Sequence, residues 1–416
     1  MPISVYPPNS EISYADTPGL DPFSRLRTSQ PFGIFDYKQV DSRLSSQFEE
    51  VTAGSGSVSY QYDRSSSYLS VGTASGDRAL RQTVRYFPYV PGKGQQIIMT
   101  GAFGAGKSNV DQYIGYGDDL NGLFFTMQGE ALGITTRTSV SGSPADTFTA
   151  STSWNVDKLD GTGPSGLVID ATKVQIFIID FQWLGVGRVR FSVDIDGVIV
   201  PVHEMLNANI ITSVYMKTPS LPVRYEIINT GVSASATTLE QICCSVASEG
   251  GYDIPGVEFS VGNGVTKRAV TARAPIFAVR LKSSFPAGEP NRRTARYLKI
   301  GAVASSSDAF VELAHIHSPS SITATWSPVS ADSAVEYSTD ITAVTGNPEH
   351  VVDTFTAVSG LGSASGQDNL SSEFINAHSY ISQNFGSNNS QMFVVYATSY
   401  SGTSNVSAGI GFIEFS

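Results

Sequence analysis

Residues 188–204, RVRFSVDIDGVIVPVHE, decide the fold class. Polar and apolar side chains alternate along the stretch, which predicts strands with one buried face. Asp196 and Gly197 then supply a two-residue turn, in which glycine tolerates a positive φ. Folding about this turn places three apolar pairs on one face: Ile195 with Val198, Val193 with Val200, and Phe191 with Val202. Because burial of that face fixes the register, we predict a β-hairpin.

The same alternation continues on both sides of the hairpin. Residues 174–183 are apolar on both faces, which predicts a central strand. Further strand-like segments follow as far as the C-terminus, separated by Gly, Ser and Thr. Glycine and proline cluster at 248–258 and suggest a boundary. We therefore expect an all-β protein with two antiparallel β-sandwich domains, jelly-roll-like, at 51–250 and 251–416, behind an extended N-terminal arm at 1–50.

The predicted arm at 1–50 is too apolar for a free tail. Its proline and glycine residues interrupt any helix. We expect an extended segment that buries its apolar side chains against the first domain, a neighbouring copy or another partner. In an assembly, its arginines would pair with carboxylates or carbonyls of the partner. The predicted assembly contacts are Phe23, Arg25, Leu26, Arg27, Phe32 and Phe35.

Charge and composition argue against several classes of function. The net charge of −11 argues against binding of nucleic acid, because phosphate contacts need Lys and Arg. One basic cluster is interpreted as a solvated turn or an interface: Arg292, Arg293 and Arg296. The first 20 residues lack the regions of a secretory signal, and no stretch reaches the roughly 20 apolar residues of a membrane helix. The adjacent Cys243 and Cys244 are expected as free thiols, so we predict a protein made in cytosol without disulfides or membrane insertion.

Residues 97–109, IIMTGAFGAGKSN, match the pattern of a phosphate-binding loop. Such a loop needs a helix that begins at Lys107 and Ser108, whereas Gly115 and its neighbours leave room for one or two turns at most. Asp180 imitates a magnesium-binding carboxylate but lies within its strand rather than at the strand's end. We interpret the segment as a loop between strands and expect no cofactor, with a nucleotide-hydrolysing enzyme as a less favoured alternative.

Other polar and aromatic residues could belong to a metal site or a glycan site, but the sequence does not supply a complete set of residues for either. His315 and His317 would share one strand face, as metal ligands can, but no further ligand is evident, so surface or interface positions are favoured. Four acids could form a glycan-hydrolysing pair, although turns and solvated faces explain them: Asp180, Asp194, Asp196 and Glu204. Four tyrosines could stack on sugars, although burial or an interface is the favoured interpretation: Tyr86, Tyr89, Tyr113 and Tyr116. We therefore predict no catalytic, metal-binding or cofactor-binding residue; a glycan depolymerase is a less favoured alternative.

Five stretches, in their order along the chain, resemble the sequences of virion structural proteins of tailed bacteriophages. The stretches are DPFSRLRTSQPFGIFDYKQ (21–39), RQTVRYFPYVPGKGQQIIMTG (81–101), IFIIDFQWLGVGRVRFSVDIDG (176–197), TSVYMKTPSLPVRYEI (212–227) and LEQICCSVASEGG (239–251). The resemblance implies a non-enzymatic fibre, collar, tail- or capsid-associated subunit, made in the host cytoplasm and located in the virion. We accordingly expect a homo-oligomer, a trimer or hexamer, in contact with other virion proteins. A host-surface glycan-binding adhesin is the alternative.

Overall fold

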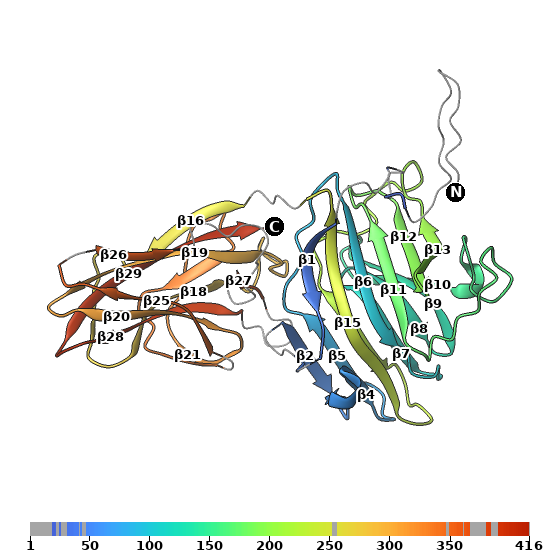
Figure 1. Cartoon of the computed structure of the whole chain (residues 1–416), viewed down its shortest axis with the longest axis horizontal. Coiled ribbons are helices and arrows are strands. Elements are labelled where there is room, and N and C mark those ends of the chain that lie inside the picture. Colours follow the sequence, from blue (N-terminus) through green and yellow to red (C-terminus); the bar gives the residue numbers. More distant parts are fainter. Residues whose placement is uncertain are drawn as a thin grey trace, which may run out of the picture.

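The computed structural model describes residues 19–21, 25, 31–40, 42–43, 47–251, 256–346, 349–360, 362–366, 380–383 and 390–415. These residues confirm the all-β prediction: they contain no α-helix, and only 3-10 turns at Tyr62–Arg64 and Ser151–Ser153 interrupt the strands. Two β-sandwiches lie side by side (Figure 1). No helix of the described chain is long and apolar enough to span a bilayer.

The first sandwich consists of two antiparallel sheets. One sheet has the order β13 (Val198–Met205), β12 (Val189–Ile195), β11 (Gln175–Phe181), β6 (Gly94–Ala102), β15 (Thr237–Glu249), β4 (Ser66–Val71) and β3 (Ser57–Gln61), with β1 (Phe32–Tyr37) also paired to β15. The other has the order β10 (Ala145–Ala150), β9 (Ala131–Thr138), β8 (Gly122–Gln128), β7 (Val110–Gly117), β14 (Val223–Asn229), β5 (Arg78–Thr83) and β2 (Phe48–Ala53). We call these the β6 sheet and the β7 sheet.

The second sandwich has the same plan. One sheet has the order β16 (Val257–Gly262), β29 (Ser404–Phe415), β19 (Thr294–Ser305) and β26 (Gly362–Gly366), with β17 (Arg268–Val270) on β29 and β27 (Tyr380–Ile381) on β19. The other has the order β22 (Ser327–Pro328), β23 (Val335–Ser338), β18 (Ala274–Leu281), β28 (Met392–Ser399), β20 (Ala309–Ile316) and β25 (Glu349–Ala357). A separate pair is β21 (Pro319–Thr323) with β24 (Ala343–Gly346).

The β12–β13 hairpin forms about the predicted turn. Asp196 and Gly197 have φ values of 54° and 81°, as a two-residue turn between twisted strands requires. Two predicted pairs are confirmed: Ile195 with Val198 and Val193 with Val200. The third is wrong, because the register shifts and Phe191 lies opposite His203. Pro201 precedes the shift and has no N–H to donate to the ladder, which favours a bulge there.

The first sandwich begins earlier than the predicted boundary at residue 51. Strand β1 pairs with β15 of the β6 sheet, and β2 begins at Phe48 in the β7 sheet. Ile34, Phe35 and Tyr37 are buried in the core between the sheets. The described strands from β1 to β15 pair only among themselves, as do those from β16 to β29. Part of the predicted arm at 1–50 is therefore a component of the first sandwich.

Candidate functional site

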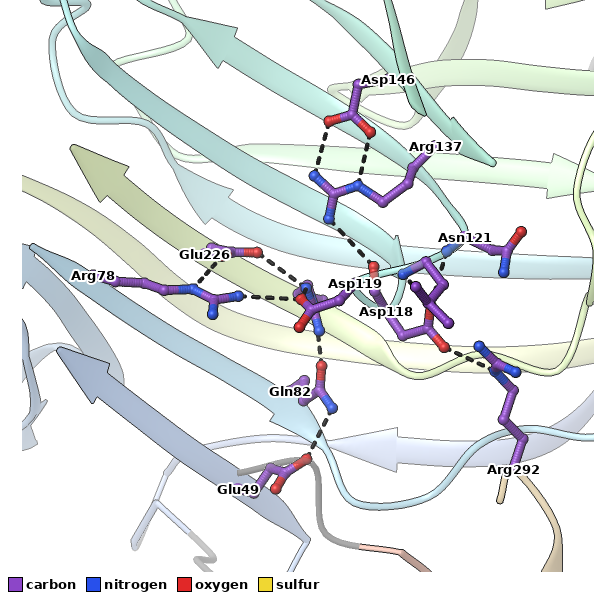
Figure 2. Close-up of polar contacts among 12 residues, drawn as sticks. Glu49, Arg78, Gln82, Asp118, Asp119, Asn121, Arg137, Asp146, Glu226 and Arg292 are labelled. Atoms are coloured by element: carbon purple, nitrogen blue, oxygen red, sulfur yellow. Dashed lines mark hydrogen bonds and ion pairs between the residues drawn. The ribbon is translucent and has the colours of Figure 1, made fainter. Parts of the chain in front are cut away.

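A network of arginines and carboxylates lies on the outer face of the β7 sheet (Figure 2). Alternation along β14 sends Tyr225 into the core and Arg224 and Glu226 to the outer face. The fully buried Arg224 donates from Nη1 to Asp119 Oδ1 at 2.6 Å and to Glu226 Oε2 at 3.1 Å. Burial alone would lower the pKa of Arg224, but these two carboxylates raise it. The guanidinium therefore stays charged inside the protein.

Further pairs extend this network, which we call the outer-face network. Arg78 donates from Nε to Glu226 at 2.6 Å and from Nη2 to Asp119 at 3.2 Å. Arg137 holds Asp146 through two bonds of 2.8 Å each, the two-pronged geometry that suits guanidinium and carboxylate. Although burial acts to raise it, the neighbouring arginines hold the pKa of Asp119 below its ordinary value. Asp119 is thus ionised and paired with Arg78 and Arg224.

The outer-face network also joins the two sandwiches. Arg292, from the second sandwich, donates from Nε to Asp118 Oδ2 at 2.8 Å (Figure 2). The side chains are 12% and 5% exposed, so this ion pair is largely shielded from solvent. Asp118 Oδ1 accepts from the backbone N–H groups of Leu120 and Asn121, at 2.8 Å each. The interpretation of the basic cluster as a solvated turn or an interface is therefore correct for Arg292, which lies at the interface.

A second feature is a groove of about 650 Å³ between β9, β10 and β13, next to the chain at 206–215. Its described lining residues are Ile134, Thr136, Thr138, Val140, Ser141, Ala145, Thr147, Thr149, His203, Met205, Asn207, Ile211, Ser213, Val214 and Tyr215. None of them is an Asp, Glu, Lys or Arg. We call this the edge groove, because β10 and β13 are the outermost strands of their sheets.

His203 is the imidazole of the edge groove. The backbone N–H of Asn155 donates to its Nδ1 at 3.3 Å, which leaves the proton of the neutral ring on Nε2. Burial lowers the pKa of His203, and the opposing effect of Glu204 is smaller. The ring is therefore neutral at neutral pH. The hydroxyl of the neighbouring Thr136 donates to Met205 Sδ at 3.3 Å.

The structure assigns the phosphate-loop motif to a connection between the sheets. Residues 103–107 are irregular, 108–109 form a turn, and β7 begins at Val110, so no helix begins at Ser108. Lys107 Nζ donates to the carbonyl oxygen of Ala236 at 2.5 Å. A Cβ on Gly106 would lie 2.8 Å from the Cα of Glu130, so the glycine serves close packing. The interpretation as a loop between strands is confirmed.

The predicted assembly contacts fall into three groups. Phe35 is 8% exposed and Phe32 is partly buried, both against the core of the chain's own first sandwich. Arg25 donates to Asp21 Oδ2 at 2.6 Å and to the carbonyl of Gly92 at 3.2 Å. The three others lie outside the described residues: Phe23, Leu26 and Arg27. For Phe35, packing within the chain therefore replaces the predicted role, because its ring has little surface left for a partner.

The four tyrosines considered for sugar stacking are buried, which confirms the favoured alternative. Tyr86, Tyr89, Tyr113 and Tyr116 are all at most 7% exposed. Burial raises the pKa of each, to about 12 for Tyr89. Two rings of the described residues are strongly exposed, Tyr62 at 72% and Tyr400 at 61%, and they lie in different sandwiches.

The predicted surface histidines are also buried. His315 and His317 are 1% and 4% exposed, and both contact the amide of Gln391, at 3.4 Å and 2.9 Å. Among the described residues, no group of three or more His, Cys, Asp and Glu side chains is placed to hold a metal ion. Cys243 and Cys244 are free, as predicted, and burial raises the pKa of both thiols.

The acids considered for glycan hydrolysis are held by neighbouring groups. Asp180 is 2% exposed and lies opposite Arg190 in the β11–β12 pairing. Arg190 also donates to Glu204 Oε1 at 2.8 Å. Asp194 accepts the N–H of Gly197 at 2.8 Å, within the hairpin turn. The prediction of a solvated face is therefore wrong for Asp180, because its side chain is buried.

Comparison with known proteins gives no family. No family profile matches the chain, and no curated protein matches it. Solved structures similar to about half of the chain include a β-glucanase from Bacillus licheniformis (11% identity, 53% of this chain and 98% of that chain, TM-score 0.34). Others are a legume lectin-like domain from Entamoeba histolytica (8%, 55% and 100%, 0.31) and a putative β-glucanase from Mycobacterium abscessus (10%, 51% and 99%, 0.36). At such TM-scores the likeness carries no argument about function.

Proposed function

We propose that the chain is a non-enzymatic structural subunit of a tailed-phage virion, peripheral on the particle and present as a trimer or hexamer. The observation that carries the proposal is the outer-face network, in which Arg292 of the second sandwich binds Asp118 of the first. A structural subunit of a particle needs its two domains to keep a fixed orientation relative to each other. The shielded ion pair at this joint supports that requirement, because a buried charge favours only the geometry that pairs it.

The state of the carboxylates favours a structural role over an enzymatic one. A general acid or base works best with a pKa near the working pH, usually raised by burial or by a second acid. In the outer-face network the pKa of Asp119 is instead lowered by arginines, and Glu226 is shared between Arg78 and Arg224. These groups therefore resemble fixed ionic crosslinks. The low content of charged residues, 15%, also suits large protein–protein contacts.

Light scattering after gel filtration tests the oligomer, and antibody labelling of intact particles tests the location. We expect a mass of at least three chains and label at one defined place on the virion. A stable monomer that no particle contains would contradict the proposal.

The remaining arm residues, Arg25 above all, are the proposed contacts, and Arg25→Ala should reduce the oligomeric mass while leaving the sandwich folded.

Glycan binding is the second candidate function, as in a host-surface adhesin. The observation that favours it is the edge groove, with its hydroxyl groups and its lack of charged lining residues. A subunit on the outside of a particle can carry such a site without any chemistry. Binding of neutral glycans to the purified chain tests this candidate separately from the oligomer.

A further inference from the structure

Hydroxyl groups occupy core-facing positions at one end of the β7 sheet. Ile134 on β9 faces the core and is 1% exposed. Alternation places Thr136 and Thr138 on the same face of β9. The opposite residues on β10 are Thr149 against Ile134, Thr147 against Thr136, and Ala145 against Thr138. Thr147 is exposed, and Thr136, Thr138 and Thr149 are half-buried, so these hydroxyls lie at the rim of the core, where a ligand can reach them.

The opposite wall of the edge groove combines apolar and polar groups in the same way. Met205, Ile211 and Val214 contribute apolar surface, whereas Asn207 and Ser213 contribute an amide and a hydroxyl. His203 adds a neutral imidazole with its proton on Nε2. Both walls therefore present hydrogen-bonding groups beside C–H surfaces, and they do so without formal charge.

We propose that the edge groove binds a neutral oligosaccharide, an inference that rests on glycan binding as the second candidate function. A sugar chain presents hydroxyls and C–H faces in alternation, which the threonine wall and the aliphatic wall match. The volume of about 650 Å³ lies within the range of small-ligand sites. The groove lies at the outermost strands of both sheets, where a chain longer than the site can continue into solvent.

The lining distinguishes this ligand from two rivals. A charged glycan would lose hydration on entering a groove whose described lining residues include no Lys or Arg, a loss that no ion pair would offset. An added peptide strand would pair with the backbone of an edge strand. The edge groove lies between the sheets instead and is lined by side chains from the inner faces of β9 and β10. Its chemistry therefore favours a ligand recognised by side-chain hydroxyls.

Saturation-transfer NMR on the full chain tests the proposal. The probes are hexasaccharides of glucose, galactose and mannose, with an oligogalacturonate as the charged match and a peptide of residues 1–18 as the peptide rival. The test variant is Thr136→Val with Thr147→Val, which removes two facing hydroxyls and keeps their shape. The control is Thr52→Val, an exposed threonine on β2 at the other edge of the same sheet.

We expect at least one neutral hexasaccharide to bind, the double variant to weaken binding at least tenfold, and Thr52→Val to leave it unchanged. Binding that the double variant does not alter would overturn the edge groove as the site while glycan binding stands. No binding of any neutral hexasaccharide would overturn both. Equal or tighter binding of the oligogalacturonate, or of the peptide in competition, would overturn the assignment of the ligand.

Discussion

The two faces of the β7 sheet differ in how they satisfy their polar groups. On the outer face, Arg224 is fully buried, yet Asp119, Glu226 and Gln82 surround its guanidinium. On the inner face at β9 and β10, the polar groups are hydroxyls at the border of a groove. The outer face holds charge that is matched within the chain, whereas the inner face keeps hydrogen-bonding capacity that the described chain uses little. The first arrangement builds architecture, and the second suits a ligand.

The largest expected effect is the loss of the central cation. Arg224→Met leaves two carboxylates short of a partner, so we expect the free energy of unfolding to fall by about 3–5 kcal/mol. Urea unfolding followed by fluorescence measures it, because Trp154 and Trp183 both pack in the first sandwich. Adding Glu226→Gln should recover much of the loss.

An exposed ion pair provides the control for this variant. The Lys173 and Asp170 side chains are 77% and 50% exposed, so Lys173→Met should change stability by less than about 1 kcal/mol. If Arg224→Met were as mild as Lys173→Met, the outer-face network would not hold the fold, and the contrast between the two faces would disappear.

The joint between the sandwiches should give the second largest effect. Asp118→Asn keeps an acceptor for the backbone but removes the charge that binds Arg292, at an expected cost of about 1.5–3 kcal/mol. Glu289→Gln removes the partner of Lys217 in the other described ion pair across the joint, 46% and 31% exposed, and should cost less than about 1 kcal/mol. Calorimetry should show the two sandwiches melting further apart in the first variant. If Glu289→Gln cost more than Asp118→Asn, the Arg292–Asp118 ion pair would not be the main contact that holds the two sandwiches together.

The sequence predicts the parts of this molecule that depend on neighbouring residues. The turn at Asp196 and Gly197 follows from local φ preferences, and the apolar alternation follows from burial. Pro201 is a signal for the bulge that is present in the sequence, since proline cannot donate to the ladder. The residues around Gly115 correctly predict that the helix required by a phosphate loop does not begin at Ser108.

The parts that depend on distant residues were not predictable. Arg292 and Asp118 are 174 positions apart, so their contact appears only once both sandwiches are built. Arg190 is another example, because its Nη1 donates at 3.1 Å to the carbonyl oxygen of Leu20, which lies 170 positions away in the chain. One signal for the network was present: Arg224 and Glu226 carry opposite charges on one face of an otherwise apolar strand. In the sequence, the threonines of the edge groove have the pattern of an ordinary solvated strand face. Only the structure shows that β13 lies beside them and forms a groove.

The edge groove and the outer-face network should lose stability in different ranges of pH. The pKa of folded His203 lies below 6.5, so the unfolded chain binds the proton first, and the stability that this group contributes is lost as pH falls below about 6.5. The pKa of folded Asp119 lies below 3.8, so its contribution persists to about pH 4 and is lost below that. His203→Gln should therefore flatten the stability profile between pH 7 and 5, and Asp119→Asn between pH 4 and 2. Unfolding midpoints measured across pH check both, and an exchange of the two windows would contradict the assignment.

The smallest expected effect on stability belongs to the variant with the largest expected effect on binding. Thr136→Val with Thr147→Val should change the free energy of unfolding by about 0.5 kcal/mol or less, because Thr147 is exposed, Thr136 is half-buried, and the hydroxyl of Thr136 contacts the weak acceptor sulfur of Met205. Thr52→Val serves as the reference in the same urea titration. A loss above about 1 kcal/mol would mean that the hydroxyls support the fold, and the inner face would then resemble the outer one. A neutral result would show that their hydroxyls are dispensable for folding, as residues retained for a ligand would be.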